Sequence, residues 1–453
     1  MVTKAVARKK QVMILSSTPV LGKGSSRSKQ DDSVVDTDSP LNMNMIGDTH
    51  LTHFLSAVLP ISLYNDKPES LHQVLAALAA DFRQLFTTGV TVNGKKFFIC
   101  VIGCKGDCPY LVKAGRFDRS FARRPLKRSS KKACPGICHL CLAGKETDSQ
   151  GIAVEIPYED YGTEQPAWLE TMGVEPAYEV PSAFAAIPFL KDGAQGGLDM
   201  FFQFDLFHNL HLGLGKNFIA SAICVCMELI NNSIAGAFED LTRDFRAYCQ
   251  RNRQSPYHKT LSASLLGVEG GFQDVPDAAW NKGDHTRLLL QWFEDYCSRE
   301  VLGKTRDPLY ILCAEATMAI NECVGGLYKE GLFVKAPRAE YLATKGLVFL
   351  QRYRQLAVMC FRLRKKRFPL MPKGHYLHHQ FLSMLHASRQ GPWCINILVY
   401  ANQMSEDFVG KPSRLSRRVS AKTASLRVLQ RSFLAIRNSI CSTLDLGDLK
   451  LGT

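Results

Sequence analysis

Lys96-Phe97-Phe98-Ile99-Cys100-Val101-Ile102-Gly103-Cys104-Lys105-Gly106-Asp107-Cys108-Pro109 is the stretch that decides the expected fold. Its first half, residues 97–103, is rich in aromatic and β-branched side chains, which predicts a buried strand. Asn93-Gly94 precedes it and is the strongest short signal for a hairpin, so this strand is expected to be the second arm. Gly106 and Pro109 bracket Asp107, so the strand should end there. A carboxylate at a strand end beside a glycine is well placed to bind a hard cation in a cleft.

A set of cysteines and histidines has the spacing of a zinc site. Cys138 and Cys141 form a Cys-x-x-Cys pair, and His375 lies three residues before His378 and four before His379. On a helix, this spacing places His375 on one face with one of the other two. Two thiolates and two imidazoles have the softness that Zn²⁺ prefers. The sequence therefore predicts one structural zinc ion.

Each half of this set is weak evidence alone, because many Cys-x-x-Cys pairs are two buried thiols and many histidine pairs are structural. Cys134 and His139 lie beside the cysteine pair and could complete a local site instead. Both arrangements stay open at the level of the sequence.

The overall composition favours a polyanionic partner. The 453 residues suggest two or three domains, and 46% hydrophobic and 22% charged residues are ordinary for a globular protein. The net charge of +14 and the pI of about 9.1 favour nucleic acid ahead of an anionic membrane surface. No run of about 18 apolar residues and no secretory signal is evident, so we expect no membrane span. The 15 cysteines, an odd number, indicate a reducing compartment.

Four regions follow from the pattern along the chain. Residues 1–40 are expected to be a disordered basic segment, and 41–150 a partial α/β core with the zinc knuckle. Residues 151–367 should be mostly helical, and 368–453 should hold the histidine pair, a closing strand and helix, and a basic tail. Helices are predicted at 50–63, 71–86, 217–231, 235–250, 285–301, 308–327 and 337–364.

Two further acidic positions and one histidine are candidates for chemistry. Asp205 and His208 form an Asp-x-x-His motif after an apolar strand, and Glu406 follows the strand-like run 394–400. Phosphoryl transfer by two metal ions needs carboxylates that converge from different strands. Asp107, Asp205 and Glu406 could supply these with Mg²⁺, although surface acids and a structural histidine are the simpler interpretation of each motif alone.

Basic residues gather in two places that could contact phosphates. The first lies between residues 116 and 132, next to Asp107, and the second is the C-terminal tail. The proposed contacts are Arg116, Arg119, Arg123, Arg124, Lys127, Arg128, Lys411, Arg414, Arg417 and Arg418. A solvated basic loop explains the first group equally well.

The order of these motifs resembles the second half of the catalytic region of cut-and-paste transposases, above all the CACTA (En/Spm) type, with the hAT type and the V(D)J recombinase as more distant relatives. The resemblance covers about residues 41–437. It implies an α/β fold, an interrupted RNase H-like core with a large all-α insertion domain. It places the second catalytic Asp at Asp107, the Asp/Cys-x-x-His motif at Asp205 and His208, and the closing Glu at Glu406. It also implies a zinc clamp of Cys138, Cys141, His375 and either His378 or His379.

One departure from this family decides the expected function. Its first catalytic Asp ends a core strand, yet the only strand-like run upstream is 11–15, and Asp36 and Asp38 lie in linker sequence. We therefore expect a truncated or domesticated DDE-type transposase remnant in the nucleus that binds DNA and is inactive in strand transfer. A zinc-stabilised helical scaffold without a nucleic-acid role and an active metal-dependent nuclease are the alternatives. Whether the chain forms a homo-oligomer is left open.

Overall fold

The structure is a computed structural model that describes residues 12–20, 52–123, 134–147, 152, 156–188, 198–228, 233–420 and 423–443. The linker expected at residues 22–38 lies outside these ranges. Helices dominate the described part, and its strands pair only two by two. The fold is therefore mixed and rich in helix. A single RNase H-like sheet is not formed by these strands, so that core stays a proposal.

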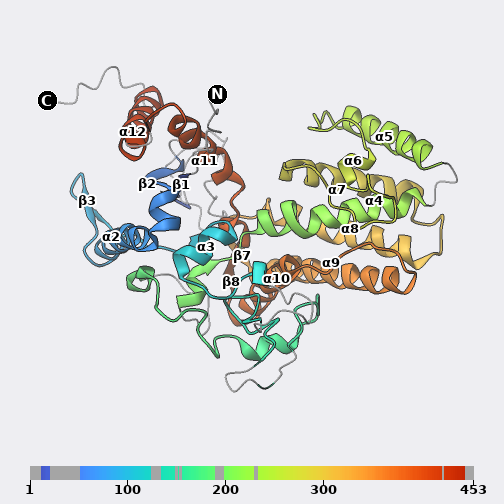
Figure 1. Cartoon of the computed structure of the whole chain (residues 1–453), viewed down its shortest axis with the longest axis horizontal. Helices are drawn as coiled ribbons and strands as arrows, with labels where there is room; N and C mark the ends of the chain where they lie inside the picture. The colour runs from blue at the N-terminus through green and yellow to red at the C-terminus, as the bar shows by residue number, and fades with distance from the viewer. Residues whose placement is uncertain are drawn as a thin grey trace, which may run out of the picture.

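A layer of long helices forms one side of the molecule (Figure 1). Its long members are α4 (Gly215–Met227), α5 (Ile234–Arg251), α7 (Gly283–Glu300), α8 (Pro308–Leu327) and α9 (Ala336–Arg362), with the short α6 (Ala263–Leu266) between α5 and α7 in the sequence. The helix α10 (Pro372–Gln390) follows the layer in the sequence and packs against α9. The apolar spacing of the sequence predicted most of these helices, and they are confirmed within a few residues at each end. Their buried faces make up most of the largest hydrophobic core.

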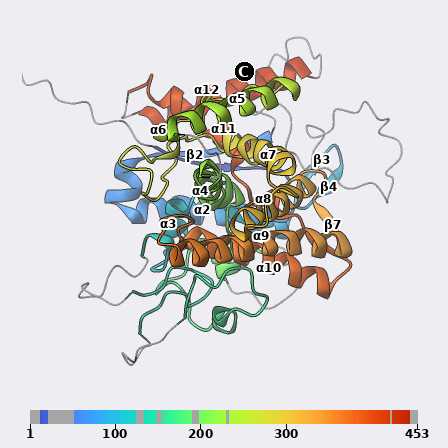
Figure 2. The same ribbon diagram turned by 90° about the vertical axis from the view of Figure 1, so that its right-hand side faces the viewer.

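The central helix of this layer is α4 together with the helical segment Phe207–Leu214 that precedes it. By length and composition, the stretch Phe207–Met227 is apolar enough to cross a membrane. However, 83% of its most apolar 18-residue segment is buried inside the protein. Figure 2 looks along the layer and shows α4 beside α7 and α8, and Phe218 of α4 contacts Phe349 of α9. A helix that is apolar on all sides is expected in such a position.

A smaller unit packs at the other side, where β1 (Val12–Ser17) pairs antiparallel with β2 (Phe54–Pro60). The amphipathic helix predicted at residues 71–86 is confirmed as α2 (Pro68–Thr87), and its Leu71 and Leu75 join Leu15 and Leu59 in one hydrophobic cluster. The helices α11 (Gln403–Ser416) and α12 (Ala424–Thr443) cover the same strands. Two separate hydrophobic clusters hold this unit together.

The helix predicted at residues 50–63 is wrong, because this segment holds the strand β2. Its register shifts at Ser56, opposite Leu15 and Ser16. One extra residue in a strand shifts the alternation of its side chains, so that residues three apart, instead of two, lie on the same face. Leu55 and Val58 thus enter one hydrophobic cluster, and their spacing of three imitates a helix.

The buried strand predicted at residues 97–103 is also wrong. The hairpin at Asn93-Gly94 forms, but its arms are short: β3 is Val90–Val92 and β4 is Lys95–Phe97. Phe97 and Phe98 are 51% and 59% exposed. Apolar composition predicts burial only where a neighbouring element covers the side chains. The chain regains a strand at β5 (Cys104–Lys105), which pairs in parallel with β6 (Phe202–Gln203).

The remaining elements are short. They are the helix α3 (Cys108–Gly115), the strands β7 (Phe333–Lys335) and β8 (Trp393–Ile395), which pair antiparallel, and the single turns Ser62–Asp66, Phe121–Arg123, Ala167–Thr171, Ala183–Ala186, Leu198–Phe201 and Ile397–Tyr400. The strand expected at residues 394–400 is thus only partly present, since a helical turn replaces its second half.

Asn396 joins this turn to the helical layer. Its side chain is fully buried, donates to the carbonyls of Leu327 (2.9 Å) and Gly331 (3.1 Å), and accepts from the backbone N–H of Leu398 (3.0 Å). The ammonium group of Lys105 donates hydrogen bonds to the carbonyls of Val399, in this turn, and of Ala401, directly after it. Asn396 therefore links the helices to the strand that precedes Asp107.

We predict that Asn396→Ala lowers the free energy of unfolding by about 2–4 kcal/mol, because buried backbone groups are left without their partners. Urea unfolding followed by circular dichroism measures this. The control is Asn252→Ala at an exposed helix end, where the decrease should stay below about 1 kcal/mol. Equal decreases in the two variants would contradict the prediction.

Candidate metal centre and carboxylate site

Four side chains meet in a buried cluster at the base of α10. The thiols of Cys138 and Cys141 and the Nε2 atoms of His375 and His379 all lie within 4.8 Å of one another. Cys141 Sγ is 3.3 Å from both imidazoles, Cys138 Sγ is 3.5 Å from His379, and the two imidazole nitrogens are 3.1 Å apart. Zn²⁺ in a tetrahedral site, with Zn–N near 2.0–2.1 Å and Zn–S near 2.3 Å, places its ligand atoms about 3.3–3.8 Å apart. The cluster can hold a metal ion such as zinc.

The two thiols of this cluster shift in opposite directions: burial, and then the hydrogen bond and charge of Cys138, raise the pKa of Cys141, whereas the pKa of Cys138 is lowered. Burial opposes ionisation of Cys138, but its hydrogen bonds with Cys141, His375 and His379 outweigh this effect and lower the pKa of the thiol. Burial lowers the pKa of His379 to about 4, so its ring is neutral at pH 7. The N–H of Leu140 donates to the sulfur of Cys138 at 3.3 Å. A thiolate and a neutral imidazole are the forms that bind zinc.

The other candidate ligands, His378, His139 and Cys134, are not part of this cluster. Nε2 of His378 is hydrogen-bonded to the carbonyl of Thr163 at 2.7 Å, and Nε2 of His139 to that of Phe202 at 3.0 Å. The thiol of Cys134 is not one of the four clustered ligand atoms. Of the two histidine pairs that the sequence left open, the structure selects the pair spaced by four.

Trp168, which the sequence did not single out, packs over this centre. Its ring centroid lies 4.0 Å from that of His379 and 4.7 Å from that of His375, and its side chain is fully buried. It comes from the short turn Ala167–Thr171 in the segment that the sequence marked only as loop. No periodic pattern announces a residue of this kind, because its role depends on a distant helix.

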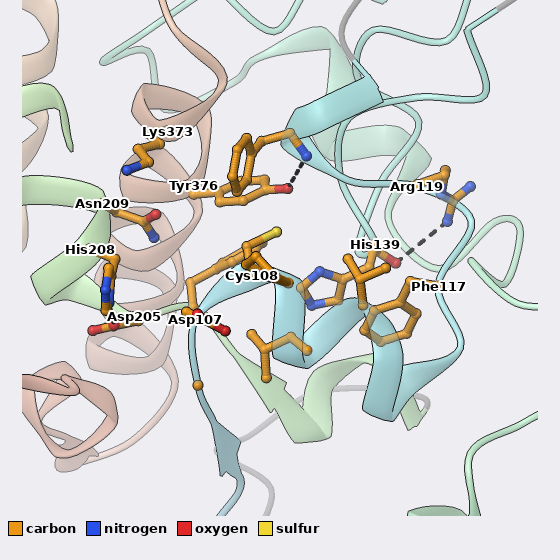
Figure 3. Close-up of a pocket in the computed structure, with 16 residues that line it drawn as sticks. Asp107, Cys108, Phe117, Arg119, His139, Asp205, His208, Asn209, Lys373 and Tyr376 are labelled. Atoms are coloured by element: carbon orange, nitrogen blue, oxygen red, sulfur yellow. Dashed lines mark hydrogen bonds and ion pairs between the residues drawn. The ribbon is translucent and has the colours of Figure 1, made fainter. Parts of the chain in front are cut away.

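The candidate catalytic residues Asp107, Asp205, His208 and Glu406 form a second group. His208 is hydrogen-bonded through Nδ1 to a carboxylate oxygen of Asp205, and its Nε2 lies 3.7 Å from Oε1 of Glu406. Asp107 lines the same cavity as Asp205 and His208 (Figure 3). The structure thus brings together residues from three segments that are far apart in the sequence.

Because these groups lie close together, the acids shift the pKa of His208, and His208, Asp205 and Asp107 shift that of Glu406. Burial lowers the pKa of His208, but the hydrogen bond and charge of Asp205, and then the charges of Glu406 and Asp107, outweigh it and raise the pKa. Partial burial raises the pKa of Glu406, and the charges of Asp205 and Asp107 add to this against the opposing effect of His208. Asp107 and Glu406 therefore act on one another across the site.

Three of the six carboxylate oxygens of Asp107, Asp205 and Glu406 accept hydrogen bonds. One oxygen of Asp205 accepts from the N–H groups of Phe207 and Asn402, both at 2.9 Å, and the other is bonded to His208. Asp107 caps α3 by accepting from the N–H of Tyr110 at 2.9 Å. Both residues therefore also have structural roles, as acids at the start of helical segments often do.

Two lysines that the sequence did not indicate stand next to these acids. Burial lowers the pKa of Lys105 to about 8, against the charge of Asp205. Lys373 lines the cavity, and burial together with the charge of Lys216 lowers its pKa. A run of basic residues can be found in a sequence, whereas an isolated buried lysine shows its role only in the fold.

The cavity itself has a volume of about 240 Å³. Figure 3 shows the acids and His208 at one end and His139, Phe117 and Arg119 at the other, with Tyr376 above. Rings pair along its walls: Phe117 stacks on His139 (4.6 Å between centroids) and Phe204 on Tyr376 (4.3 Å). The walls are therefore aromatic, and the polar groups lie at the ends.

The basic residues proposed as phosphate contacts divide into four groups. Arg119 is 3% exposed and donates to the carbonyls of His139 and Glu175, so it is not available for a phosphate. Arg116 forms an ion pair with Glu69 at 3.1 Å. Arg414, Arg417 and Arg418 are exposed and Lys411 is half-buried on and after α11. The side chain of Arg123, and Arg124, Lys127 and Arg128, lie outside the described residues.

No protein-family model, curated protein or solved structure matches the chain. The interpretation of the site therefore rests on its own residues.

We predict that the purified protein contains about one zinc ion per chain, and that Cys138→Ala/Cys141→Ala removes it, because only two of the four ligands remain. Elemental analysis by mass spectrometry measures this. His378→Ala is the matched control: it removes an equally buried histidine of α10 but no ligand atom, so zinc should be retained. Full zinc occupancy in the double cysteine variant would contradict the site.

Proposed function

We propose that the chain is a DNA-binding protein derived from a DDE-type transposase, with a structural zinc centre and without strand-transfer activity of its own. The observation that supports this most is the meeting of Asp107, Asp205, His208 and Glu406 in front of the Cys2His2 cluster. The transposase resemblance requires these residues, in this order along the chain, to converge. Unrelated surface acids would have no reason to do so.

The zinc centre would act as a clamp. When bound, the ion joins the loop that holds Cys138 and Cys141 to α10, which provides His375 and His379. Such sites stabilise a fold and do no chemistry when all four ligands come from the protein. The two joined segments flank the helical layer in the sequence, so the clamp would hold that layer against the carboxylate site.

The carboxylate site does not fit two magnesium ions. Mg²⁺ needs near-octahedral oxygen ligands, but both oxygens of Asp205 and one of Asp107 already accept hydrogen bonds. His208 contacts acids through both ring nitrogens, and its raised pKa favours the charged form in which it supplies positive charge there. We therefore infer that the imidazole balances these acids and that the site is not built for strand cleavage.

The surface best suited to DNA is the end of α11. Glu406 lies in its first turn, at the carboxylate site, and Arg414 lies in its last turn, followed by Arg417 and Arg418. One helix thus leads from the site to an exposed cationic end. Phosphate contacts of this kind provide affinity without base specificity.

Replacing Lys411, Arg414, Arg417 and Arg418 by Gln should weaken binding to a generic duplex. The slope of log K against log salt should fall by about 0.9 for each phosphate that the variant no longer neutralises. Fluorescence anisotropy with a labelled duplex at several salt concentrations measures both quantities. Four exposed basic residues elsewhere serve as the matched control, namely Lys67, Arg83, Arg243 and Lys329. Equal effects in the two variants would argue against a defined DNA surface.

Incubation of the protein with supercoiled plasmid and Mg²⁺ or Mn²⁺ should give no nicking above that of Asp107→Ala, because the donor set does not support two ions. Gel electrophoresis of the plasmid measures this. Strong nicking that Asp107→Ala abolishes would instead identify an active nuclease, and a further carboxylate would then have to be present.

A role as a protein-binding scaffold is favoured by one observation. The hairpin of β3 and β4 exposes Val90, Val92, Phe97 and Phe98 at 41–59%, and contiguous exposed apolar side chains often mark protein interfaces. The duplex-binding assay separates the two functions, since a scaffold of this kind would not bind DNA in a salt-dependent manner.

A further inference from the structure

The turn at the end of α9, residues 360–368, presents the most exposed large apolar side chain of the described residues. Phe361 is 83% exposed and Leu363, two residues later, is 54% exposed. Single exposed apolar residues are common. Phe361 differs because the backbone that follows it is anchored to the protein at Arg367 and Phe368 and because cations flank it.

The backbone of this turn departs from the usual preference of a helix end. The N–H of Lys365 bonds to the carbonyl of Cys360 (2.8 Å), and that of Arg364 to Phe361 (3.0 Å). This is a Schellman ending, in which the left-handed position is usually glycine. Here it is Arg364, with φ +55°. A non-glycine residue in this conformation lowers the stability of the protein. Arg364 is therefore not the residue that stability alone would favour at this position.

Hydrogen bonds of Arg367 and Phe368 anchor the turn to the helical side of the protein. Arg367 is 4% exposed and donates to the carbonyls of Phe272 and Asp274, the latter at 2.8 Å. Phe368 is buried, and its N–H donates to the hydroxyl of Ser221 at 3.1 Å. The exposed residues are therefore presented on a fixed support, which reduces the entropic cost of binding a partner.

Charge around Phe361 is positive. Residues 361–368 contain Arg362, Arg364, Lys365, Lys366 and Arg367 and no acid. Lys365 pairs with Glu228, and Lys366 lies 3.7 Å from Asp274. Arg362 and Arg364 are exposed, and no acidic partner for either is found among the described residues.

We propose that this turn is a binding site for single-stranded nucleic acid, in which Phe361 stacks on an unpaired base and Arg362 and Arg364 contact the flanking phosphates. Exposed aromatic rings next to cations are the recurrent means of holding single strands without sequence preference. Favourable interaction with the helix dipole explains basic residues at a helix end, but neither the exposed ring nor the left-handed arginine. A membrane anchor is the less suitable interpretation, because a single ring provides much less apolar surface than the apolar face of a membrane-binding helix.

This surface is separate from the carboxylate site. In Figure 1 the C-terminal end of α9 lies at the far end of the helical layer from α11. The proposal therefore goes beyond duplex binding at α11 and does not depend on it. The full chain would contact a duplex at one end and an unpaired strand at the other.

The first test uses the full-length protein and a fluorescently labelled oligothymidylate of 20 nucleotides. Phe361→Ala should weaken binding about tenfold, and Phe361→Trp should retain it, because stacking of one base is worth about 1–3 kcal/mol. Arg362→Gln/Arg364→Gln should lower the salt slope by about 0.7 for each phosphate released. Phe98→Ala, at a 59% exposed phenylalanine of the hairpin, should bind as the wild type does.

A second test separates binding from stability. Arg364→Gly should raise Tm by about 2 °C, because glycine adopts positive φ without strain, yet weaken binding to the oligonucleotide. Arg253 provides the matched control: it follows α5 with φ +53° and makes the same pair of backbone hydrogen bonds. Arg253→Gly should also raise Tm but leave binding unchanged.

Wild-type binding by both Phe361→Ala and Arg364→Gly would overturn the proposal. So would binding of this turn to phosphatidylserine vesicles in preference to the oligonucleotide. Loss of duplex binding in the α11 variant with intact oligothymidylate binding would leave this proposal standing, and the reverse pattern would leave duplex binding at α11 standing.

Discussion

The meeting of two thiols with two imidazoles is the interaction on which the rest of this structure depends. Cys138 and Cys141 lie in an irregular loop that has little regular secondary structure of its own, whereas His375 and His379 lie one turn apart on α10. Loops gain order from side chains and ligands and not from backbone ladders. The loop has a few backbone hydrogen bonds, such as that from the N–H of Ile137 to the carbonyl of Ala143 at 2.9 Å, and the cluster adds a link from the loop to α10.

The helix α10 extends this influence to the carboxylate site. Tyr376 donates from its hydroxyl to the carbonyl of Ile137 at 2.6 Å and accepts from the N–H of Phe121 at 2.9 Å. Gln380 donates to the carbonyl of Phe204, the residue before Asp205, at 2.8 Å. One face of α10 thus holds the metal ligands, a wall of the cavity and the backbone next to the Asp-x-x-His motif. Disturbance of the cluster would be felt at all three.

Much of this arrangement could be predicted from the sequence, and the failures have identifiable causes. Ligand spacing and helical periodicity are local, so most of the long helices were predicted, and so was a set of two cysteines and two histidines in which the choice between His378 and His379 stayed open. The strand β2 was missed because a bulge gave Leu55 and Val58 the spacing of a helix. Burial was misjudged for Phe98 and for Arg119, in opposite directions. Both errors concern which element covers a side chain, a property that composition does not contain. Lys105 and Trp168 were missed for the same reason.

The distance along the chain between the two halves of the cluster also has a consequence for biosynthesis. His375 follows Cys141 by 234 residues. At about 5–20 residues per second, the ribosome needs roughly 10 to 50 s to reach α10 after the cysteines have been made. Helices form in about a microsecond, so the helical layer can assemble long before its clamp is complete. During that interval the two thiols have no histidine partners, and a reducing environment with available zinc would be needed to keep them fit for the final closure.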